Sequence, residues 1–254
     1  MPVFRQTAVR WATALLLVAS ITSCTPTTTR RGGSDQQAIQ AAAAGTQSAR
    51  ATTPDGSWQS LFDGRTIVGW HGFSTPGVIP AGWQAVDGAI TRVGDGDDLV
   101  TDKVFGNFEL TLEWRIAAKG NSGILYRIDP AATVTYESGP EMQVLDDDGH
   151  PDGKLRVTAA GSAFALYPAP LGAVKKVGEW NAIRLVVNGA HVEHWLNGVK
   201  TVEYELWSPD WLQRVQASKF KQWTNYGLAK RGYIGLQNHG DMVSFRSIRI
   251  RELL

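Results

Sequence analysis

Hydrophobic and polar residues alternate regularly in several segments of this chain. Residues 108–116 read Phe-Glu-Leu-Thr-Leu-Glu-Trp-Arg-Ile, with an apolar side chain at every second position. A period of two over nine residues predicts a β-strand with one buried face. Asn188-Gly189 and Asn197-Gly198 separate three shorter alternating segments. Because Asn-Gly is typical of tight hairpin turns, these segments are expected to form an antiparallel meander.

The same pattern predicts strands along the whole second part of the chain. The expected strands are residues 83–86, 89–93, 108–116, 123–128, 141–145, 162–167, 181–187, 191–196, 199–204, 232–238 and 243–251. In the last of them the apolar positions change phase between Phe245 and Ile248, which predicts a β-bulge. One short helix is expected after Ser208, where Ser-Pro-Asp supplies an N-cap hydroxyl, a proline and an acid. Many expected strands and a single short helix favour an all-β antiparallel sandwich, with a β-barrel as the competing architecture.

The first residues have the composition of an export signal. Arg5 and Arg10 precede an apolar run over residues 11–21 that is too short to cross a bilayer as a helix. With the small residues that follow, this predicts a signal peptide over residues 1–23. The single cysteine, Cys24, stands at the boundary, which resembles the lipobox of bacterial lipoproteins. The resemblance implies lipid attachment at Cys24, membrane anchoring and a periplasmic or cell-surface location.

Residues 24–56 are expected to form a flexible tether. Beyond Cys24 they consist mainly of Thr, Ala, Gln, Ser and Gly, and Ile39 is their one large apolar residue. Such a segment cannot bury enough surface to offset the entropy lost on ordering. Residues 57–254 are therefore expected to form the folded domain, with the tether holding it off the membrane.

Composition and charge exclude some classes of function. The chain has 25 Lys+Arg against 24 Asp+Glu, a formal net charge of +1, so it lacks the basic excess typical of a nucleic-acid-binding protein. At 43% hydrophobic residues with ten tryptophans it can bury a sizeable core. One cysteine permits no intrachain disulfide and no cysteine-based structural zinc site.

Polar side chains suited to chemistry lie on the expected outer faces of three strands. Alternation separates Glu141 and Gln143 from the apolar residues beside them, and it separates Gln237 and His239 in the same way. Alternation likewise places Arg127 on the face of its strand opposite Ile124 and Tyr126. Any sheet with one solvated face carries outward polar residues, but interleaving with glycines and aromatics favours a site here. If the strands share a sheet, these groups gather on its open face.

Two acidic runs, at residues 95–98 and 146–149, raise the question of a calcium site. Calcium takes six to eight oxygen ligands, and loops rich in Asp and Gly supply them. Neither run has EF-hand spacing, and Asp-Gly is first of all a turn signal. Structural turns are therefore the favoured interpretation.

A set of motifs extends in order over residues 58–251. The motifs are Leu61-Phe62-Asp63-Gly64, Gly69-Trp70, Gly120–Arg127, Pro140–Asp147, Gly178–Asn181, Glu193–Gly198, Ser218–Lys221 and Gly235–Gly240. Together they resemble the 3-keto-disaccharide hydrolase domain family, formerly domain of unknown function 1080. The chain departs from the family pattern at two places. Asn238 stands where the family commonly has Asp, and residues 163–167 are a variant of the family's Ala-Gly-Ala-Leu-Tyr stretch.

The resemblance implies a concanavalin-like two-sheet sandwich (jelly roll) acting on glycosides that carry a ketone at C3. The ketone acidifies the proton on C2, so a base can remove it and the substituent on C1 can leave. Such chemistry needs a base, an acid and a group that holds the enolate oxygen. Glu141 and His239 are the candidate acid and base, in either order, and Arg127 or a bound divalent metal ion is the candidate enolate stabiliser. The expected substrate-binding residues are Arg127, Gln143, Asp146, Lys219 and Gln237.

Two other functions fit the same fold. A non-catalytic carbohydrate-binding lipoprotein would use aromatic side chains instead of acid–base groups. A glucan hydrolase of the laminarinase type needs carboxylates at Glu-x-Asp-x-x-Glu spacing, and the chain contains no Glu-x-Asp. The partners expected from the sequence are a carbohydrate substrate and, through the lipid anchor, a membrane, but no nucleic acid.

Overall fold

The structure is a computed structural model that describes residues 56–254. The predicted signal peptide, Cys24 and the tether up to residue 55 lie outside the described residues, so these predictions stay predictions. Within residues 56–254, no helix combines the length and hydrophobicity needed to cross a membrane.

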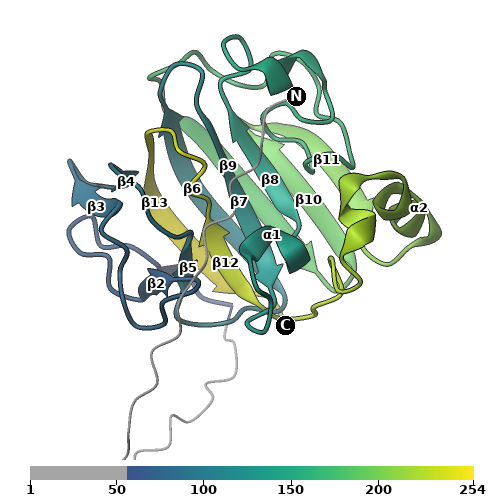
Figure 1. The fold of residues 1–254 in the computed structure, drawn as a ribbon, viewed down its shortest axis with the longest axis horizontal. Helices are drawn as coiled ribbons and strands as arrows, with labels where there is room; N and C mark the ends of the chain where they lie inside the picture. Colours follow the sequence, from purple (N-terminus) through teal and green to yellow (C-terminus); the bar gives the residue numbers. More distant parts are fainter. Residues whose placement is uncertain (1–55) are drawn as a thin grey trace, which may run out of the picture. The chain divides into compact units, whose positions relative to one another are not determined.

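The larger of two antiparallel sheets has eight strands (Figure 1). Its order is β11 (Val199–Glu205), β10 (His191–Leu196), β9 (Asn181–Asn188), β6 (Phe108–Ile116), β13 (Val243–Glu252), β4 (Ala89–Arg92) and β3 (Trp83–Val86), with β1 (Gln59–Ser60) paired to β13. The β9–β10–β11 meander predicted from the two Asn-Gly turns is confirmed.

The smaller sheet has five strands and carries most of the side chains that matter below. Its order is β2 (Trp70–Gly72), β5 (Leu99–Thr101), β12 (Tyr233–Leu236), β7 (Asn121–Ile128) and β8 (Glu141–Leu145). The helical elements are α1 (Thr135–Ser138), α2 (Pro209–Ala217) and the 3₁₀ turns η1 (Pro151–Lys154) and η2 (Lys219–Gln222). In Figure 1, α1 lies over the small sheet and α2 lies beside β11.

The hydrophobic core lies between the two sheets. Alternate residues of β6, among them Leu112 and Trp114, pack in one cluster with Ile124 of β7 and Met142 of β8. Two separate packed sheets confirm the predicted all-β sandwich and exclude the barrel for residues 56–254. The predicted helix is confirmed as α2, where the Ser208 hydroxyl caps the first turn by accepting from the backbone N–H of Trp211.

The strand pairing contains three register shifts, one of them between β10 and β11 and the other two at bulges in β13 and β7. The predicted bulge in β13 is confirmed between Arg246 and Arg249. A second bulge, in β7, was not predicted: the register with β12 shifts, and Arg127 has a positive φ of 50°. As a result, Leu125 and Ile128 pack in the same outer cluster although they are three residues apart.

The expected strand at residues 162–167 is wrong. The segment instead folds as a tight turn, with only isolated bridges from Ala163 to Met142 and to Tyr167. Ala165 has a φ of 60°, which interrupts an extended chain. The turn lies along the free edge of β8, where its backbone bonds to that of Glu141 and Gln143. A covering loop, and not another strand, therefore ends the small sheet.

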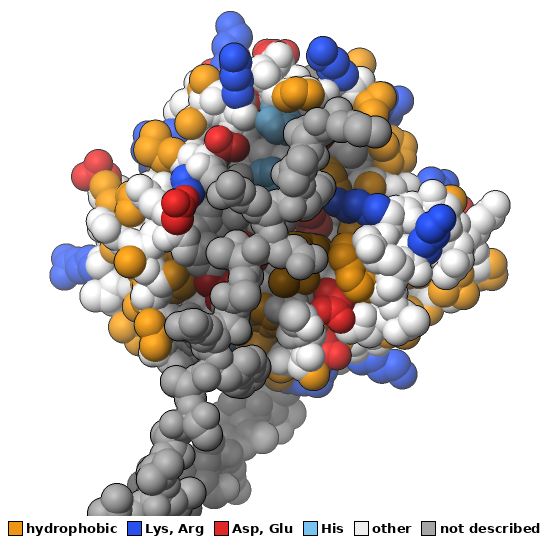
Figure 2. All heavy atoms as spheres, in the orientation of Figure 1, with side chains coloured by type: hydrophobic (Ala, Val, Ile, Leu, Met, Phe, Trp, Pro, Cys, Tyr) orange, Lys and Arg blue, Asp and Glu red, His pale blue; other side chains and the backbone are white. Residues whose placement is uncertain are grey.

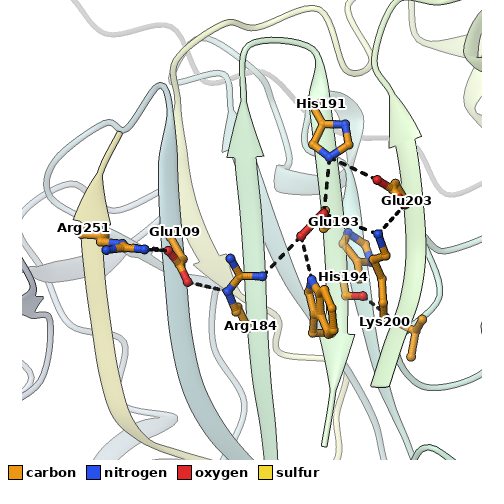
Figure 3. A network of polar contacts seen from close by, with 10 residues as sticks. Glu109, Arg184, His191, Glu193, His194, Lys200, Glu203 and Arg251 are labelled. Carbon is orange, nitrogen blue, oxygen red and sulfur yellow. Dashed lines mark hydrogen bonds and ion pairs between the residues drawn. The ribbon is translucent and has the colours of Figure 1, made fainter. Parts of the chain in front are cut away.

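The solvent-facing side of the large sheet carries a cross-strand ionic network (Figure 3). Glu109 of β6 accepts from Arg184 of β9 at 2.5 Å and from Arg251 of β13 at 2.7 Å. Arg184 also pairs with Glu193 of β10, which is near Lys200 of β11. Burial raises the pKa of Glu109, but the two arginines outweigh it and lower the pKa overall. On the face shown in Figure 2, acidic and basic side chains are interspersed with hydrophobic ones.

Candidate active site

A cavity of about 360 Å³ opens on the outer face of the small sheet. Its lining residues are Asn121, Tyr136, Glu141, Gln143, Phe164, Lys219, Trp223, Gln237 and His239. Buried polar side chains form its floor, and half-buried or exposed aromatic and basic side chains form its rim. This size and mixture are typical of small-ligand sites.

Glu141 is the carboxylic acid of the cavity floor. It is the first residue of β8, and its side chain lies over Gly123 of β7, where a Cβ would come within 2.1 Å of Oε1. A glycine at this position therefore makes room for the carboxyl group. Burial raises the pKa of Glu141 to about 8, with Lys219 acting in the opposite direction and Asp98 and Asp152 adding to the rise. The acid is mainly protonated at neutral pH.

Two glutamine amides beside Glu141 have free hydrogen-bonding capacity. The Gln143 side chain is 1% exposed, and neither its Oε1 nor its Nε2 has a partner among the described residues. Oε1 of Gln237 is also buried without a partner. Buried amides are nearly always hydrogen-bonded, so these atoms indicate a polar ligand, such as a sugar hydroxyl, or water.

The end of β12 places Gln237 and His239 at the cavity. Hydrogen bonding to β7 continues one residue beyond the end of β12, where the backbone N–H of Gln237 donates to the Gly123 carbonyl. The Ser122 hydroxyl in turn donates to the Gln237 carbonyl at 2.8 Å. His239 follows two residues later and is exposed at the rim. Its imidazole is therefore open to a ligand from the solvent side.

One side of the rim is aromatic. Tyr136 of α1 and Trp223, just after η2, meet edge to face with ring centroids 5.5 Å apart. Lys219 lies with its Nζ 4.3 Å from the centroid of the Phe164 ring. The rim thus combines flat apolar surfaces with one ammonium group.

The structure brings together five of the seven predicted catalytic and substrate-binding residues. Those five are Glu141, Gln143, Lys219, Gln237 and His239. Arg127 does not reach the cavity. Its guanidinium donates to the carbonyls of Gly106 and Gly189 and to Asn107 Oδ1 instead. The bulge in β7 explains the difference, because Arg127 is the residue with positive φ at which the alternation breaks.

Asp146 also lies outside the lining of this cavity. Its carboxylate accepts from the backbone N–H of Lys119 at 2.7 Å and of Gly149 at 3.2 Å. Asp147 similarly accepts from Ala160. Asp146 and Asp147 therefore close a loop, as expected for a structural turn, and Asp146 does not line the cavity.

Four lining residues were not predicted as site residues. Asn121 shares a strand face with Gly123, so alternation alone could have included it. Tyr136, Phe164 and Trp223 belong to a four-residue helix, a turn and the end of a 3₁₀ element. Such short elements have no periodicity, so no pattern in the sequence indicated these three.

Residues 56–254 contain one group of side chains that could hold a divalent metal ion. His191, Glu193 and Glu203 offer ligand atoms that lie within 4.8 Å of one another. They belong to β10 and β11 on the outer face of the large sheet (Figure 3), and Lys200 already pairs with both glutamates. None of the three lines the cavity, where the described residues provide no comparable group.

Comparison with known proteins decides the family. Residues 57–251 match the family described as the 3-keto-alpha-glucoside-1,2-lyase-like domain. The chain belongs to this family. A curated 3-keto-disaccharide hydrolase of Bacteroides thetaiotaomicron is 37% identical over 226 residues, which cover 76% of this chain and 78% of the relative. The resemblance found from the sequence motifs is thereby confirmed.

Solved structures support the fold of this lyase-like domain. A protein of Parabacteroides distasonis, provisionally assigned as a glycosyl hydrolase, superposes with a TM-score of 0.72 at 33% identity, covering 78% of this chain and 94% of that one. A second protein of that organism with the same provisional assignment gives a TM-score of 0.61 at 28% identity, covering 78% and 100%.

Proposed function

We propose that the protein cleaves 3-keto-glycosides, such as 3-keto-disaccharides, by elimination and hydration. The observation that carries the proposal is a buried carboxylic acid, Glu141, whose pKa is raised to about 8, in a cavity shared with His239. Perturbed acids in clefts are typical of acid–base catalysis. Family membership and the name of the curated relative supply the substrate class.

The reaction starts with removal of the proton on C2. In our proposal the His239 imidazole accepts this proton, and the electron pair of the C–H bond forms an enolate with the C3 oxygen. The enolate then collapses to a C1–C2 double bond, and the C1–O bond breaks with its electron pair going to the leaving oxygen. Protonated Glu141 donates a proton to that oxygen. Water then adds its oxygen to C1 and a hydrogen to C2, so the net change is hydrolysis.

The charge that develops on the C3 oxygen requires a cation or hydrogen-bond donors. Lys219 is the cationic side chain in the cavity lining, and we assign it the role for which Arg127 or a bound divalent metal ion was the candidate from the sequence. Electrostatic stabilisation of this kind is often the largest contribution to catalysis. The unpartnered amides of Gln143 and Gln237 are suited to bind ring hydroxyls.

The aromatic rim suits the leaving group. Tyr136 and Trp223 present flat apolar surfaces, and pyranose rings bind such surfaces through their C–H faces. With the ketosugar on the polar floor, the second ring of a disaccharide would extend toward this rim.

The test is incubation of the purified domain with a 3-keto-disaccharide, with and without chelator, followed by chromatography of the sugars. Release of both monosaccharides, slowed by about 10² to 10⁴ in Glu141→Gln and His239→Ala, is the expected result. Full turnover by both variants would overturn the proposed roles. Retention of the sugar without any product would instead support the alternative, a non-catalytic carbohydrate-binding protein.

A further inference from the structure

Asp98 connects two sides of the cavity without lining it. It immediately precedes β5, and its Oδ1 accepts from the backbone N–H of Asn238 at 2.7 Å. Its Oδ2 accepts from the hydroxyl of Thr135, the first residue of α1. The neighbours of these two partners are His239 and Tyr136, which both line the cavity. One carboxylate therefore ties the His239 segment to the Tyr136 helix.

Asn238 is fixed from its other side as well. Its Oδ1 accepts from Arg92 Nε at 2.8 Å, and its Nδ2 donates to the Gly96 carbonyl at 2.9 Å. The side chain is thus directed toward the 92–96 loop, and its backbone N–H faces Asp98. An aspartate here could not donate to Gly96. The departure of this chain from the family pattern at Asn238 therefore lies among the hydrogen bonds that hold the segment before His239.

Asp98 also contributes charge to the site. Its carboxylate interacts electrostatically with His239 and with Glu141. Burial raises the pKa of Asp98 overall, although the hydrogen bonds from Thr135 and Asn238 act in the opposite direction. Because both oxygens accept hydrogen bonds, the geometry suits the ionised form.

The charge on Glu141 depends on several neighbours. The titratable groups that interact with it or share its cavity are Lys219, Asp98, Asp152, Tyr126, Tyr136, Tyr226 and His239. Among the acids, Asp98 acts more strongly than Asp152. Asp98 also differs from Asp152 in its bond to the segment that carries His239.

We propose that Asp98 is a positioning residue of the active site, whose carboxylate holds the His239 segment against α1 and whose negative charge acts on Glu141. The roles of Glu141 and His239 rest on the proposed function. The position and charge of Asp98 relative to them do not.

The test replaces Asp98 by asparagine, which keeps the shape and the acceptor for Asn238 but removes the charge. The carboxyl carbon of Glu141 is followed by ¹³C NMR against pH, with Glu141→Gln assigning the signal. Loss of the negative charge is expected to move the midpoint of the Glu141 titration to lower pH. The alkaline limb of kcat/KM is expected to move in the same direction. The value of kcat/KM is expected to fall roughly tenfold, because without the charge the bonds from Asn238 and Thr135 are weaker and hold the His239 segment less firmly.

Two control variants separate charge from attachment. Thr135→Val removes one tie and no charge, so turnover is expected to fall while the Glu141 midpoint stays in place. Asp152→Asn removes the acidic charge that acts less strongly on Glu141, so the Glu141 midpoint is expected to shift less than in Asp98→Asn. Asp152 also makes no hydrogen bond to the His239 segment. An Asp98→Asn midpoint that equals the wild-type value, or moves no further than in Asp152→Asn, would overturn the proposal. So would wild-type turnover in Thr135→Val.

The titration needs no substrate, which separates this proposal from the proposed function. A shifted midpoint in a chain that releases no sugar would overturn the proposed function and support the electrostatic role of Asp98. An unshifted midpoint in an active enzyme would support the proposed function and overturn the electrostatic role of Asp98. Thermal unfolding of each variant shows that the fold is retained.

Discussion

At the level of single residues, the position of Glu141 depends on the absence of a side chain at Gly123. The glutamate and the glycine lie on neighbouring strands, β8 and β7, and the carboxyl group covers the glycine backbone. Burial is the main cause of the raised pKa of Glu141. The position of this buried acid therefore depends on the space left at Gly123.

Gly123→Ala is expected to lower kcat/KM by about a hundredfold, because the added Cβ would displace a group that must align with the leaving oxygen. Steady-state kinetics with a 3-keto-disaccharide checks this. Gly94→Ala is the matched control, since a Cβ there meets only the Gly82 Cα at 3.8 Å. Equal activity of the two variants would contradict the prediction.

Glu141→Gln is expected to separate activity from stability. Turnover falls by about 10² to 10⁴, as for loss of a general acid. The folded-state pKa of about 8 exceeds the ordinary value of 4.5, so the wild type loses stability as pH rises through this range. The variant avoids that loss. Thermal unfolding should therefore show a higher Tm for Glu141→Gln than for wild type near pH 9, and similar values near pH 4. A variant less stable than wild type near pH 9 would contradict this.

Sequence alternation located the floor of the site but not all of its surroundings. Glu141, Gln143 and Gln237 were predicted because their strands keep a strict period of two. Arg127 was misplaced because a single residue with positive φ reverses the faces of β7, and no residue type marks that position. Arginine is not a residue that favours positive φ, so its residue type gave no sign of the bulge.

At the level of elements, a stack of aromatic rings supports the rim. Tyr204 of β11 stacks on Trp211 of α2, which stacks on Tyr226, and Tyr226 stacks on Phe220 of η2 at 4.0 Å. Phe220 in turn contacts Trp223. The stack joins the large sheet to the segment that carries Lys219 and Trp223, which sets the rim in place.

Trp223→Ala is expected to raise KM for a 3-keto-disaccharide about tenfold, with much less effect on a methyl 3-keto-glucoside that lacks the second ring. The comparison of kcat/KM for the two substrates measures this. Trp180→Ala is the control, because Trp180 is similarly half-buried but packs between Arg115 and Arg246 on the large sheet. A uniform loss on both substrates would contradict a leaving-group site.

At the level of the whole molecule, the fold was predictable because its long strands are amphipathic. Strands β6, β7, β8 and β9 each bury alternate residues in a single core, so their pattern is visible in the sequence. The short strands β1, β2 and β5, with two or three residues, carry no such pattern and were missed. Their positions are set by neighbouring strands and not by their own composition.

The prediction of a lipid anchor at Cys24 concerns the whole molecule as well. In a bacterial host, wild-type protein is expected to incorporate radiolabelled palmitate and to fractionate with membranes, whereas Cys24→Ser should do neither. Because residue 24 is far in sequence from the cavity, the purified Cys24→Ser protein should keep full turnover. Equal labelling of both proteins would contradict the prediction.

The large sheet contributes no side chain to the cavity lining, although its outer face is densely ion-paired across Glu109, Arg184 and Arg251. The candidate site and the ion-paired face thus belong to different sheets. A dye, an affinity tag or a solid support attached to that outer face would leave the cavity mouth free. Immobilised enzyme coupled there is expected to turn over substrate as fast as enzyme in solution.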